Sequence, residues 1–371
     1  MSVVALGAVL PTYARQDVVL VDGDGAWVFD AEGTRYLDFV GGIAVVGLGH
    51  RHPAPLAAAH AQLDRLWHVS NLYWTEPMAQ LADRLSARFG GAQSFFCNSG
   101  AESIEAALKY ARKATGKPGV VALEGSFHGR TLGALAVTGQ PAKRAAFEPL
   151  VPGAVFAQPN DLVSLAAAVN GGTGCILLEP VLGEGGIIPL DSRFVEAART
   201  LADDAGALLV FDEVQTGVGR TGTFFAFEQL GVLPDAVTLA KGLANGLPIG
   251  CLLVSDRAAG AFAPGDHAST FGGNPVACAA AVAVCETVDD ELLAGVVAHG
   301  ATIAGRLPNV RGRGLLLAVD TTRPAADVVA DCLEHGLLVG TAGESSLRLT
   351  PPLTLTAEEL EHGLAILEEV L

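Results

Sequence analysis

The sequence predicts an α/β fold with a doubly wound, mostly parallel sheet and a smaller α+β part. Apolar runs alternate with helical patterns through the middle of the chain, and this alternation is typical of a parallel sheet covered by helices on both faces. Half of the residues are hydrophobic and 45 are glycine, which suits a tightly turned enzyme and excludes a disordered chain. The length of 371 residues exceeds one usual hydrophobic core, so we expect two or more domains.

Charge and cysteine content exclude several classes of function. The net charge of −17 argues against a nucleic-acid binder, which needs a basic face. The six cysteines form no CxxC pair, so we expect free thiols in a reducing compartment and no metal site. The first eleven residues carry no positive charge before their apolar part and make a poor signal peptide. The other apolar stretches are short or interrupted, so we expect a cytoplasmic protein without a membrane span.

The N-terminal part predicts a meander of short strands followed by two helices. Turn residues separate the strands, and helical spacing of apolar residues marks the second helix. The segment between the helices, 67–75, carries three aromatic residues in a polar loop, which fits the rim of a site, an interface or plain packing. The strands are expected over 18–21, 26–29 and 36–39, with a turn at 22–25, and the helices over 53–66 and 77–89.

A strand over 94–97 leads into Asn98-Ser99-Gly100-Ala101-Glu102 and then a helix. Ser99 and Glu102 predict a capping box at its start. One interpretation is simply a well-capped helix. The other is a phosphate site, because free N–H groups at a helix start bind anions and Gly100 lets the backbone approach closely.

The next strand, 120–123, ends in a loop that places an aromatic residue, a histidine and an arginine between glycines. The loop either carries a surface arginine or belongs to a site. In a site, Phe127 or His128 would cover a flat ligand and Arg130 would bind a carboxylate. The loop alone does not separate these interpretations.

Three later strands end in charged residues. The strands 175–178, 207–211 and 236–239 lead to Glu179, Asp212 and Lys241, and a helix over 191–205 separates the first two. A lysine at the end of a buried strand must be paired, solvated or chemically used. A lysine that reaches out to water is the commoner case, whereas an imine-forming lysine needs a lowered pKa and a carbonyl partner.

The C-terminal part predicts a small α+β region that packs with the N-terminal meander, which is too short to bury a core alone. A strand over 251–254 follows the strand 236–239 in the predicted sheet of the large domain. In the C-terminal part we expect one or two helices over 274–307, a strand over 315–319, a helix over 325–335, strands over 337–340 and 346–349, and a helix over 357–371. The predicted domains are an N-terminal segment 1–40 that joins the small domain, a large domain 41–273 and a C-terminal small domain 274–371.

The chemically interesting residues converge on one edge of the predicted sheet. Ligands of doubly wound sheets lie outside the carboxyl ends of the strands, and Ser99, Phe127, Glu179, Asp212 and Lys241 each follow a strand. A phosphate site, a stacking aromatic residue, a carboxylate and a lysine are the parts that pyridoxal phosphate requires. The lysine holds the aldehyde as an imine and moves a proton, and the carboxylate keeps the pyridine nitrogen protonated.

From Thr12 to Leu353 the sequence resembles the class III pyridoxal-phosphate aminotransferases of fold type I. The motifs are specific as a set: Asn98-Ser99-Gly100-Ala101-Glu102, Phe127-His128-Gly129-Arg130-Thr131, Leu178-Glu179-Pro180 with Gly183-Glu184-Gly185-Gly186, Asp212-Glu213-Val214-Gln215-Thr216-Gly217, Ala240-Lys241-Gly242, Ser269-Thr270-Phe271-Gly272-Gly273-Asn274-Pro275, and Leu347-Arg348-Leu349 with Pro351-Pro352.

The resemblance implies a role for each matching residue. Lys241 would carry the Schiff base, Asp212 would pair with the pyridinium nitrogen, and Gln215 would bind the ring hydroxyl oxygen. Phe127 would stack on the ring. The phosphate would be held by Ser99, Gly100 and Ala101. Thr270 would reach the phosphate of a partner subunit, which implies a homodimer with shared active sites.

The resemblance also implies how substrates bind. Arg130 would bind the α-carboxylate of the substrate. Glu184 would pair with Arg348 and mask it for one substrate, and the pair would open so that Arg348 takes the carboxylate of glutamate. The implied reaction is ping-pong transfer of an amino group from N2-acetyl-L-ornithine to 2-oxoglutarate, a step of arginine biosynthesis. The usual N-terminal helical extension is expected to be trimmed, because the chain begins close to Thr12-Tyr13.

Several alternatives stay open. Ornithine, succinylornithine, 4-aminobutyrate and LysW-lysine aminotransferases would share the cofactor residues. Ile43 stands where ornithine aminotransferases have a tyrosine, which favours an acylated or simpler amine. A glutamate-1-semialdehyde aminomutase is an isomerase of the same fold, but Glu184 and Arg348 favour two alternating substrates. A non-catalytic binding relative is disfavoured by the presence of both Lys241 and Asp212.

Overall fold

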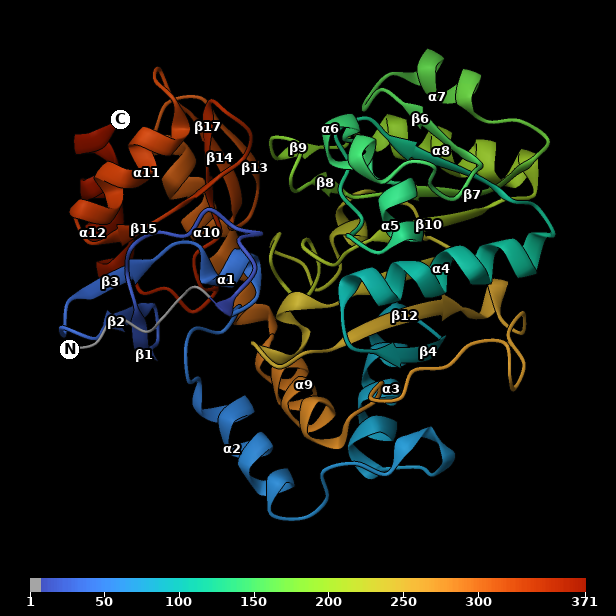
Figure 1. The fold of residues 1–371 in the computed structure, drawn as a ribbon, viewed down its shortest axis with the longest axis horizontal. Helices are drawn as coiled ribbons and strands as arrows, with labels where there is room; N and C mark the ends of the chain where they lie inside the picture. The colour runs from blue at the N-terminus through green and yellow to red at the C-terminus, as the bar shows by residue number, and fades with distance from the viewer. Residues whose placement is uncertain (1–7) are drawn as a thin grey trace.

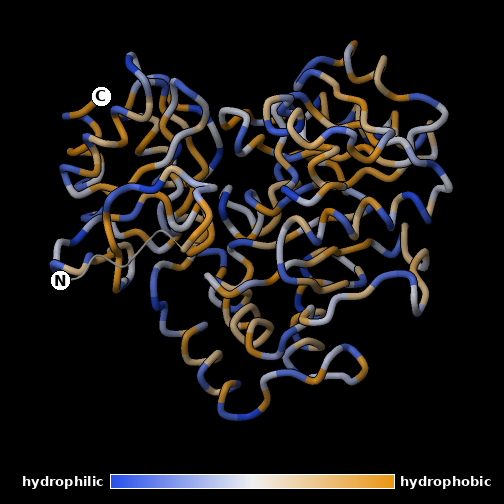
Figure 2. The backbone as a smooth tube through the Cα atoms, in the orientation of Figure 1, coloured by the Kyte–Doolittle hydropathy of each residue, from blue (hydrophilic) through white to orange (hydrophobic). Residues whose placement is uncertain are grey.

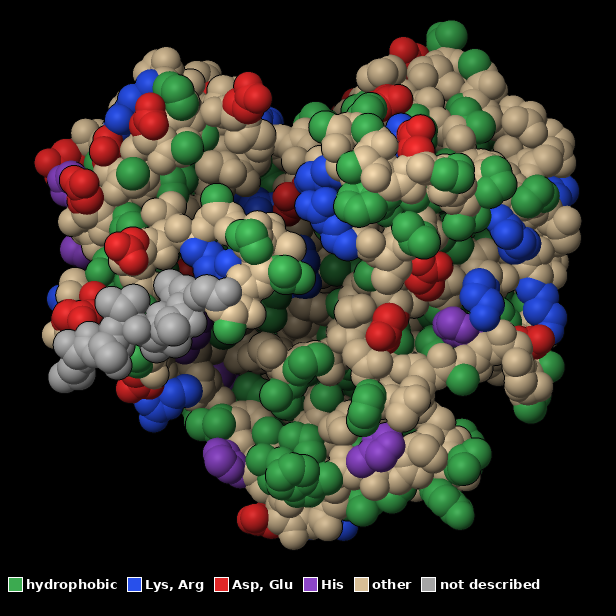
Figure 3. All heavy atoms as spheres, viewed as in Figure 1, with side chains coloured by type: hydrophobic (Ala, Val, Ile, Leu, Met, Phe, Trp, Pro, Cys, Tyr) green, Lys and Arg blue, Asp and Glu red, His purple; other side chains and the backbone are tan. Residues whose placement is uncertain are grey.

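The computed structural model describes residues 8–371 and shows two lobes (Figure 1). The space-filling view shows a cleft between them (Figure 3). The large lobe contains a seven-stranded sheet, and the small lobe contains two four-stranded sheets. Residues 1–7, which hold the start of the predicted segment 1–40 and most of the stretch considered as a signal peptide, lie outside the described residues. The predicted domain boundaries therefore remain predictions.

The sheet of the large lobe is mostly parallel, as predicted. Its second strand alone runs antiparallel to its two neighbours. Every residue of the inner strand β7 is buried, which is typical of a strand covered on both faces. The order across the sheet is β4 (Ala92–Cys97), β12 (Gly250–Ser255), β11 (Ala236–Leu239), β10 (Leu208–Asp212), β7 (Thr173–Leu178), β5 (Gly119–Leu123) and β6 (Ala154–Ala157).

Helices cover both faces of this sheet. On one face, α4 (Gly100–Thr115) packs Ile104, Ala107 and Tyr110 against strand residues that include Leu177 and Leu252. The opposite face is covered by helices that share the main hydrophobic core, and Figure 2 shows the hydrophobic strands between the layers. These helices are α3 (Glu76–Phe89), α7 (Leu162–Ala168), α8 (Ser192–Ala205) and α9 (Pro275–Thr287), with α2 (Pro53–Leu63) packed on α9.

The small lobe combines both ends of the chain. Strand β3 (Arg35–Asp38) pairs in parallel with β15 (Leu337–Leu338), so the N-terminal meander joins a sheet with a C-terminal strand. Gly363 lets α12 approach this meander, because a Cβ there would lie 2.4 Å from Phe39 Cζ. The remaining elements are β1 (Leu20–Asp24), β2 (Trp27–Asp30), α10 (Asp290–Arg306), β13 (Val310–Arg313), β14 (Leu316–Asp320), α11 (Ala325–Glu334), β16 (Gly340–Thr341), β17 (Ser346–Leu349) and α12 (Ala357–Val370).

One predicted turn was wrong, and two elements were missed. Strand β1 continues through the predicted turn at 22–25, because pairing with β2 keeps Asp22, Gly23 and Asp24 extended. The stretch 274–307 forms two helices, and Asp289 caps the second by accepting a hydrogen bond from the backbone N–H of Leu292. The edge strand β6 and helix α7 were not predicted. Among residues 8–371 no helix is both long and apolar enough to cross a membrane, and all six cysteines are free and buried.

Candidate active site

A cavity of about 400 Å³ opens at the carboxyl ends of the central strands, where the sequence placed the site. Loops after β4, β5, β10 and β11 contribute most of its wall. The predicted residues in the wall are Ser99, Gly100, Ala101, Phe127, Arg130, Asp212, Gln215 and Lys241. Apolar residues that the sequence did not single out, among them Val45, Val214 and Ile249, complete it, because nothing local distinguishes them from core residues.

The start of α4 presents free backbone donors to the cavity. Ser99 caps the helix, and its Oγ accepts a hydrogen bond from the N–H of Glu102 at 3.2 Å. The N–H groups of Gly100 and Ala101 have no acceptor among residues 8–371. A Cβ at residue 100 would lie 2.8 Å from Val214 Cγ1, so this close approach requires glycine.

The predicted capping box is only half present. The carboxylate of Glu102 does not return to the N–H of Ser99. It accepts hydrogen bonds from the backbone N–H of Asn98 at 2.6 Å and from its side-chain amide at 2.9 Å. Glu102 therefore binds two donors of Asn98 instead of the Ser99 N–H that the motif predicts. These hydrogen bonds hold the turn before the helix.

The loop that carries Phe127 is held by a buried carboxylate. Glu179 accepts hydrogen bonds from the N–H of Phe127 at 2.8 Å and of Gly183 at 2.9 Å. Burial raises the pKa of Glu179 to about 7, and the nearby Asp212 acts in the same direction. This carboxylate joins the loop that carries Phe127 to the segment that carries Gly183.

Asp212 lies at the end of β10 within a fixed set of hydrogen bonds. Its Oδ1 accepts hydrogen bonds from the Thr238 hydroxyl at 3.2 Å and from the N–H of Val214 at 3.1 Å. Its Oδ2 lies 2.7 Å from Nδ1 of the buried His128. The sequence left open whether Phe127 or His128 covers the ligand, and the structure uses His128 to hold Asp212.

Two buried polar atoms beside the cavity lack partners among the described residues. They are Nε2 of His128 and Oε1 of Gln215. Gly183 makes room for the Gln215 amide, since a Cβ at 183 would lie 2.7 Å from the amide carbon and nitrogen. Buried polar groups are normally hydrogen-bonded, so these atoms indicate a place for a polar ligand.

Lys241 follows β11 and is half-buried at the base of the cavity. Its φ of 42° lies in the left-handed region, which is costly for a residue with a Cβ and is often found at functional sites. Burial lowers the pKa of Lys241 to about 8, and Arg348 acts in the same direction. The lysine therefore has the lowered pKa that imine formation needs.

Glu184 and Arg348 form an ion pair that joins the two lobes. Arg348 is a buried residue of β17 in the small lobe, and its Nη1 also lies 3.3 Å from the carbonyl oxygen of Gly183. Burial alone would raise the pKa of Glu184, but the pairing with Arg348 holds that pKa below its usual value. The two residues are 164 positions apart, so the sequence offered no local signal for the contact.

Arg130 and Thr270 are the exposed members of the predicted set. The Arg130 guanidinium carbon lies 5.4 Å from the centre of the Phe127 ring, at the edge of the cavity. Thr270 lies outside the wall, in a loop where the Asn71 amide donates hydrogen bonds to the carbonyl oxygens of Ser269 and Gly272. The structure therefore brings most of the predicted residues into one cavity wall, places Glu184 and Arg348 close enough to act on the charge of Lys241, and leaves Thr270 outside the wall.

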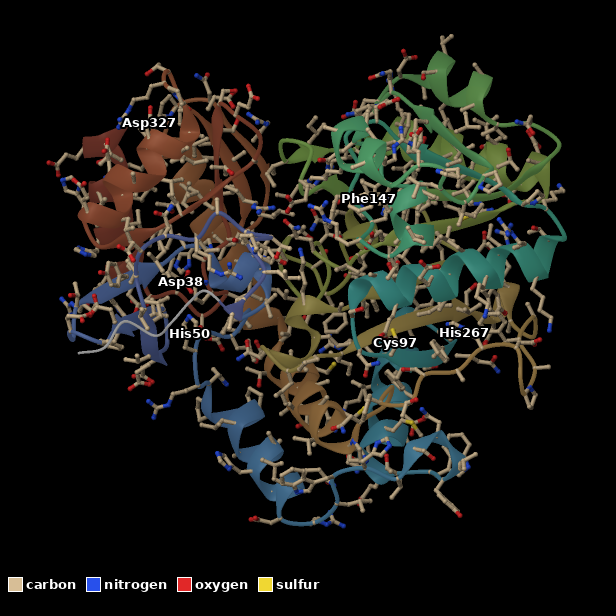
Figure 4. All side chains as sticks on the ribbon, in the orientation of Figure 1. Asp38, His50, Cys97, Phe147, His267 and Asp327 are labelled. Atoms are coloured by element: carbon tan, nitrogen blue, oxygen red, sulfur yellow. The ribbon has the colours of Figure 1, made fainter. Side chains whose placement is uncertain are left out.

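Ile43 belongs to a left-handed turn beside the cleft. Both Ile43 and Ala44 have positive φ angles, which are rare for a β-branched residue. Asp38 holds the turn, because its Oδ1 accepts hydrogen bonds from the N–H groups of Val40 and Gly41. His50 lies 2.8 Å from the other oxygen of Asp38 (Figure 4). Ile43 itself is exposed and is not part of the cavity wall.

These residues fit pyridoxal phosphate. The free N–H groups of α4 suit its phosphate, and Lys241 suits its aldehyde. The Asp212 carboxylate suits its ring nitrogen, and the unpartnered Gln215 amide suits its ring oxygen. The donor set therefore contains one matching group for each polar part of the cofactor.

The family model described as aminotransferase class-III matches residues 11–371. An acetylornithine aminotransferase of Mycolicibacterium smegmatis is 49% identical, with 97% of this chain and 95% of that protein covered. The N-acetylornithine aminotransferase structure from Stenotrophomonas maltophilia K279a aligns with a TM-score of 0.83 at 36% identity, covering 96% of each chain. A PLP-bound amine transaminase structure from an uncultivated Pseudomonas species aligns with a TM-score of 0.89 at 30% identity, covering 97% of this chain and 96% of that one.

Proposed function

This chain belongs to the class-III aminotransferases, and from that premise we propose that it moves the δ-amino group of N2-acetyl-L-ornithine to 2-oxoglutarate. The products are N-acetylglutamate 5-semialdehyde and glutamate. The enzyme is a transaminase that uses pyridoxal phosphate. The observation that carries the proposal is the ion pair between Glu184 and Arg348 beside Lys241, because two alternating substrates need a cation that can be hidden and uncovered.

The bound cofactor supplies an electrophilic carbonyl carbon and a ring that accepts electrons. Lys241 supplies the amine, and its pKa near 8 leaves a useful neutral fraction at neutral pH. Its Nζ then removes and returns the proton at the reacting carbon. Asp212, which is held by Thr238 and His128, would lie at the ring nitrogen and would stabilise a proton there.

The helix start binds the phosphate. Gly100 and Ala101 donate their free N–H groups, and the helix dipole adds a favourable field. The Ser99 oxygen already accepts the N–H of Glu102, which leaves its hydroxyl hydrogen free to donate. Phe127 would cover the ring of the cofactor. The hydrogen bond that its backbone N–H donates to the Glu179 carboxylate fixes its position.

Glu184 and Arg348 select between the two half-reactions. Acetylornithine presents no carboxylate beside its reacting amine, so Arg348 stays paired with Glu184. Glutamate reacts at its α-carbon and brings a carboxylate there, so Arg348 leaves Glu184 and binds it. Breaking a buried pair by removing one partner costs roughly 3–5 kcal/mol, and the pair avoids this cost for the first substrate. Arg130 binds the carboxylate at the other end of the substrate.

A second part of the proposal is a homodimer with shared sites. Thr270 points to a partner, because it lies outside the cavity of its own chain. Large apolar side chains are exposed near its loop: Trp67, Leu72, Tyr73, Trp74 and Phe271. Exposed apolar patches mark interaction sites. A cytoplasmic location and a role in arginine biosynthesis, both expected from the sequence, belong to the same proposal.

Mixing the holoenzyme with single amino donors tests the substrate. The absorbance of the lysine-bound cofactor reports each half-reaction. We expect fast loss of this absorbance with acetylornithine and with glutamate, and slow loss with ornithine and 4-aminobutyrate. Rapid loss with 4-aminobutyrate alone would refute the assignment.

A further inference from the structure

A second cation lies beside Arg130 on a segment that the predicted site did not include. The short helix α6 (Pro141–Arg144) carries Lys143, whose Nζ lies 4.8 Å from the centre of the Phe127 ring. The Arg130 guanidinium lies 5.4 Å from the same centre. Figure 3 shows Lys and Arg side chains gathered at the cleft on the α6 side. Two cations therefore share one aromatic ring at the edge of the cavity.

Hydrogen bonds fix α6 to the loop that carries Phe127. The Gln140 amide nitrogen donates to the carbonyl oxygens of Gly125 at 3.1 Å and Ser126 at 3.3 Å. The N–H of Gly125 donates to the carbonyl oxygen of Gly139 at 2.7 Å. These hydrogen bonds tie residues 139–140, just before α6, to residues 125–126, just before Phe127. They therefore hold Lys143 next to Phe127.

Within the described part of the chain the Lys143 ammonium has no hydrogen bond and no ion pair, although the residue is half-buried. The chain has five lysines. Three of these lysines lie in or just after α4, and each has a partner. Lys109 and Lys113 bind Asp266, and Lys117 binds the carbonyl oxygen of Ala205. Lys143 and Lys241 are the two whose ammonium groups lack a partner among residues 8–371, and Lys241 is the predicted imine former. A half-buried ammonium without a partner is costly and indicates an anionic ligand.

The charges around Lys143 are those of the substrate end of the site. Burial lowers the pKa of Lys143, Glu184 and Glu179 act to raise it, and Arg130 and Arg348 act to lower it. Glu184 is already paired with Arg348. Arg130 and Lys143 remain as two cations without a carboxylate between them.

We propose that Lys143 is a further specificity-determining residue, which together with Arg130 binds the carboxylate at the far end of the substrate. This inference rests on the proposed function, in which both substrates carry such a group. Acetylornithine reacts at its δ-amine, so its carboxylate lies at the opposite end. Glutamate reacts at its α-carbon, and its side-chain carboxylate takes the same place. The alternative is that Lys143 only positions the Phe127 ring through a cation–π contact.

Binding of glutarate, an unreactive dicarboxylate, separates these roles. Calorimetry on the holoenzyme measures its dissociation constant in the wild type, Lys143→Met and Lys143→Arg. We expect about tenfold weaker binding in Lys143→Met, as for loss of one hydrogen bond to a charged group, and near wild-type binding in Lys143→Arg. Arg144→Met is the matched control, because Arg144 is on the same helix as Lys143 but its guanidinium carbon lies 4.3 Å from the centre of the Phe156 ring in β6. Unchanged glutarate binding in Lys143→Met would overturn the proposal.

A second experiment compares two amine substrates that differ in whether they carry a carboxylate. The wild type and Lys143→Met are compared on 5-aminopentanoate, which has a far carboxylate, and on pentylamine, which has none. The proposal requires kcat/KM to fall about tenfold for the first and to stay unchanged for the second. Equal losses on both amines would assign Lys143 to positioning Phe127 and reject the proposal. If the wild type failed to use acetylornithine, the proposed function would fail, but glutarate would still decide the role of Lys143.

Discussion

The two ends of the cavity are built in different ways. The cofactor end comes from the large lobe alone, and its groups follow strands or begin a helix: Ser99, Asp212 and Lys241. The substrate end depends on charged side chains, and its central ion pair joins the two lobes through Glu184 and Arg348. The cofactor end is thus preorganised for one ligand, whereas the substrate end is built to accept two.

The largest effect is expected at the cofactor end, from Lys241→Ala. This variant should bind the cofactor without covalent attachment and lose turnover by on the order of 10⁴-fold, because it removes both the imine-forming amine and the proton carrier. Absorbance spectra and steady-state assays measure the two effects. Near-normal turnover would contradict the role given to Lys241, which is the lysine in the cavity wall.

Asp212→Asn should cost roughly 10²–10³-fold in turnover, as for loss of one preorganised electrostatic contact. The amide carries no negative charge to stabilise a proton on the ring nitrogen. Thr238→Val is the matched control, because it removes only one hydrogen bond to Asp212 Oδ1. That loss is worth about 1 kcal/mol, so a several-fold effect is expected. Equal losses in both variants would show that the charge of Asp212 is unimportant.

The pH dependence of cofactor attachment sharpens the account of Lys241. The neutral amine is the nucleophile, so attachment to the apoenzyme should speed up as pH rises through the lowered pKa of about 8 and level off above it. The expected gain between pH 7 and pH 9 is about tenfold. Nα-acetyl-lysine provides the reference, with an ordinary pKa near 10.5. A midpoint near that reference in the enzyme would contradict the burial argument.

Much of the cofactor end could be predicted from the sequence, because its signals are local. Strand ends followed by Asp212 or Lys241, and a cap at Ser99, are visible within a few residues. The fold class followed from the alternation of strands and helices. The contact of His128 with Asp212 could not be predicted from the sequence, because 84 positions separate the two residues.

Apart from Arg130, which the loop after the strand 120–123 already offered as a carboxylate ligand, the substrate end was predicted only through the family resemblance. Lys143 gave no signal, because a lysine in a short polar segment is usually solvated. Its importance depends on α6 folding back over Phe127, which only the tertiary structure reveals. The capping box at Ser99 failed in part for a related reason, because Asn98 offers Glu102 two donors that the motif does not consider.

The most direct test of the central claim, that Glu184 masks Arg348, is the rate of each half-reaction in Glu184→Ala. Single-turnover loss of the cofactor absorbance is measured with acetylornithine and, separately, with glutamate. We expect at least about tenfold slower reaction with acetylornithine, because Arg348 is left buried and unpaired. The reaction with glutamate should change little, since its carboxylate replaces Glu184. Equal losses in the two half-reactions would contradict the account.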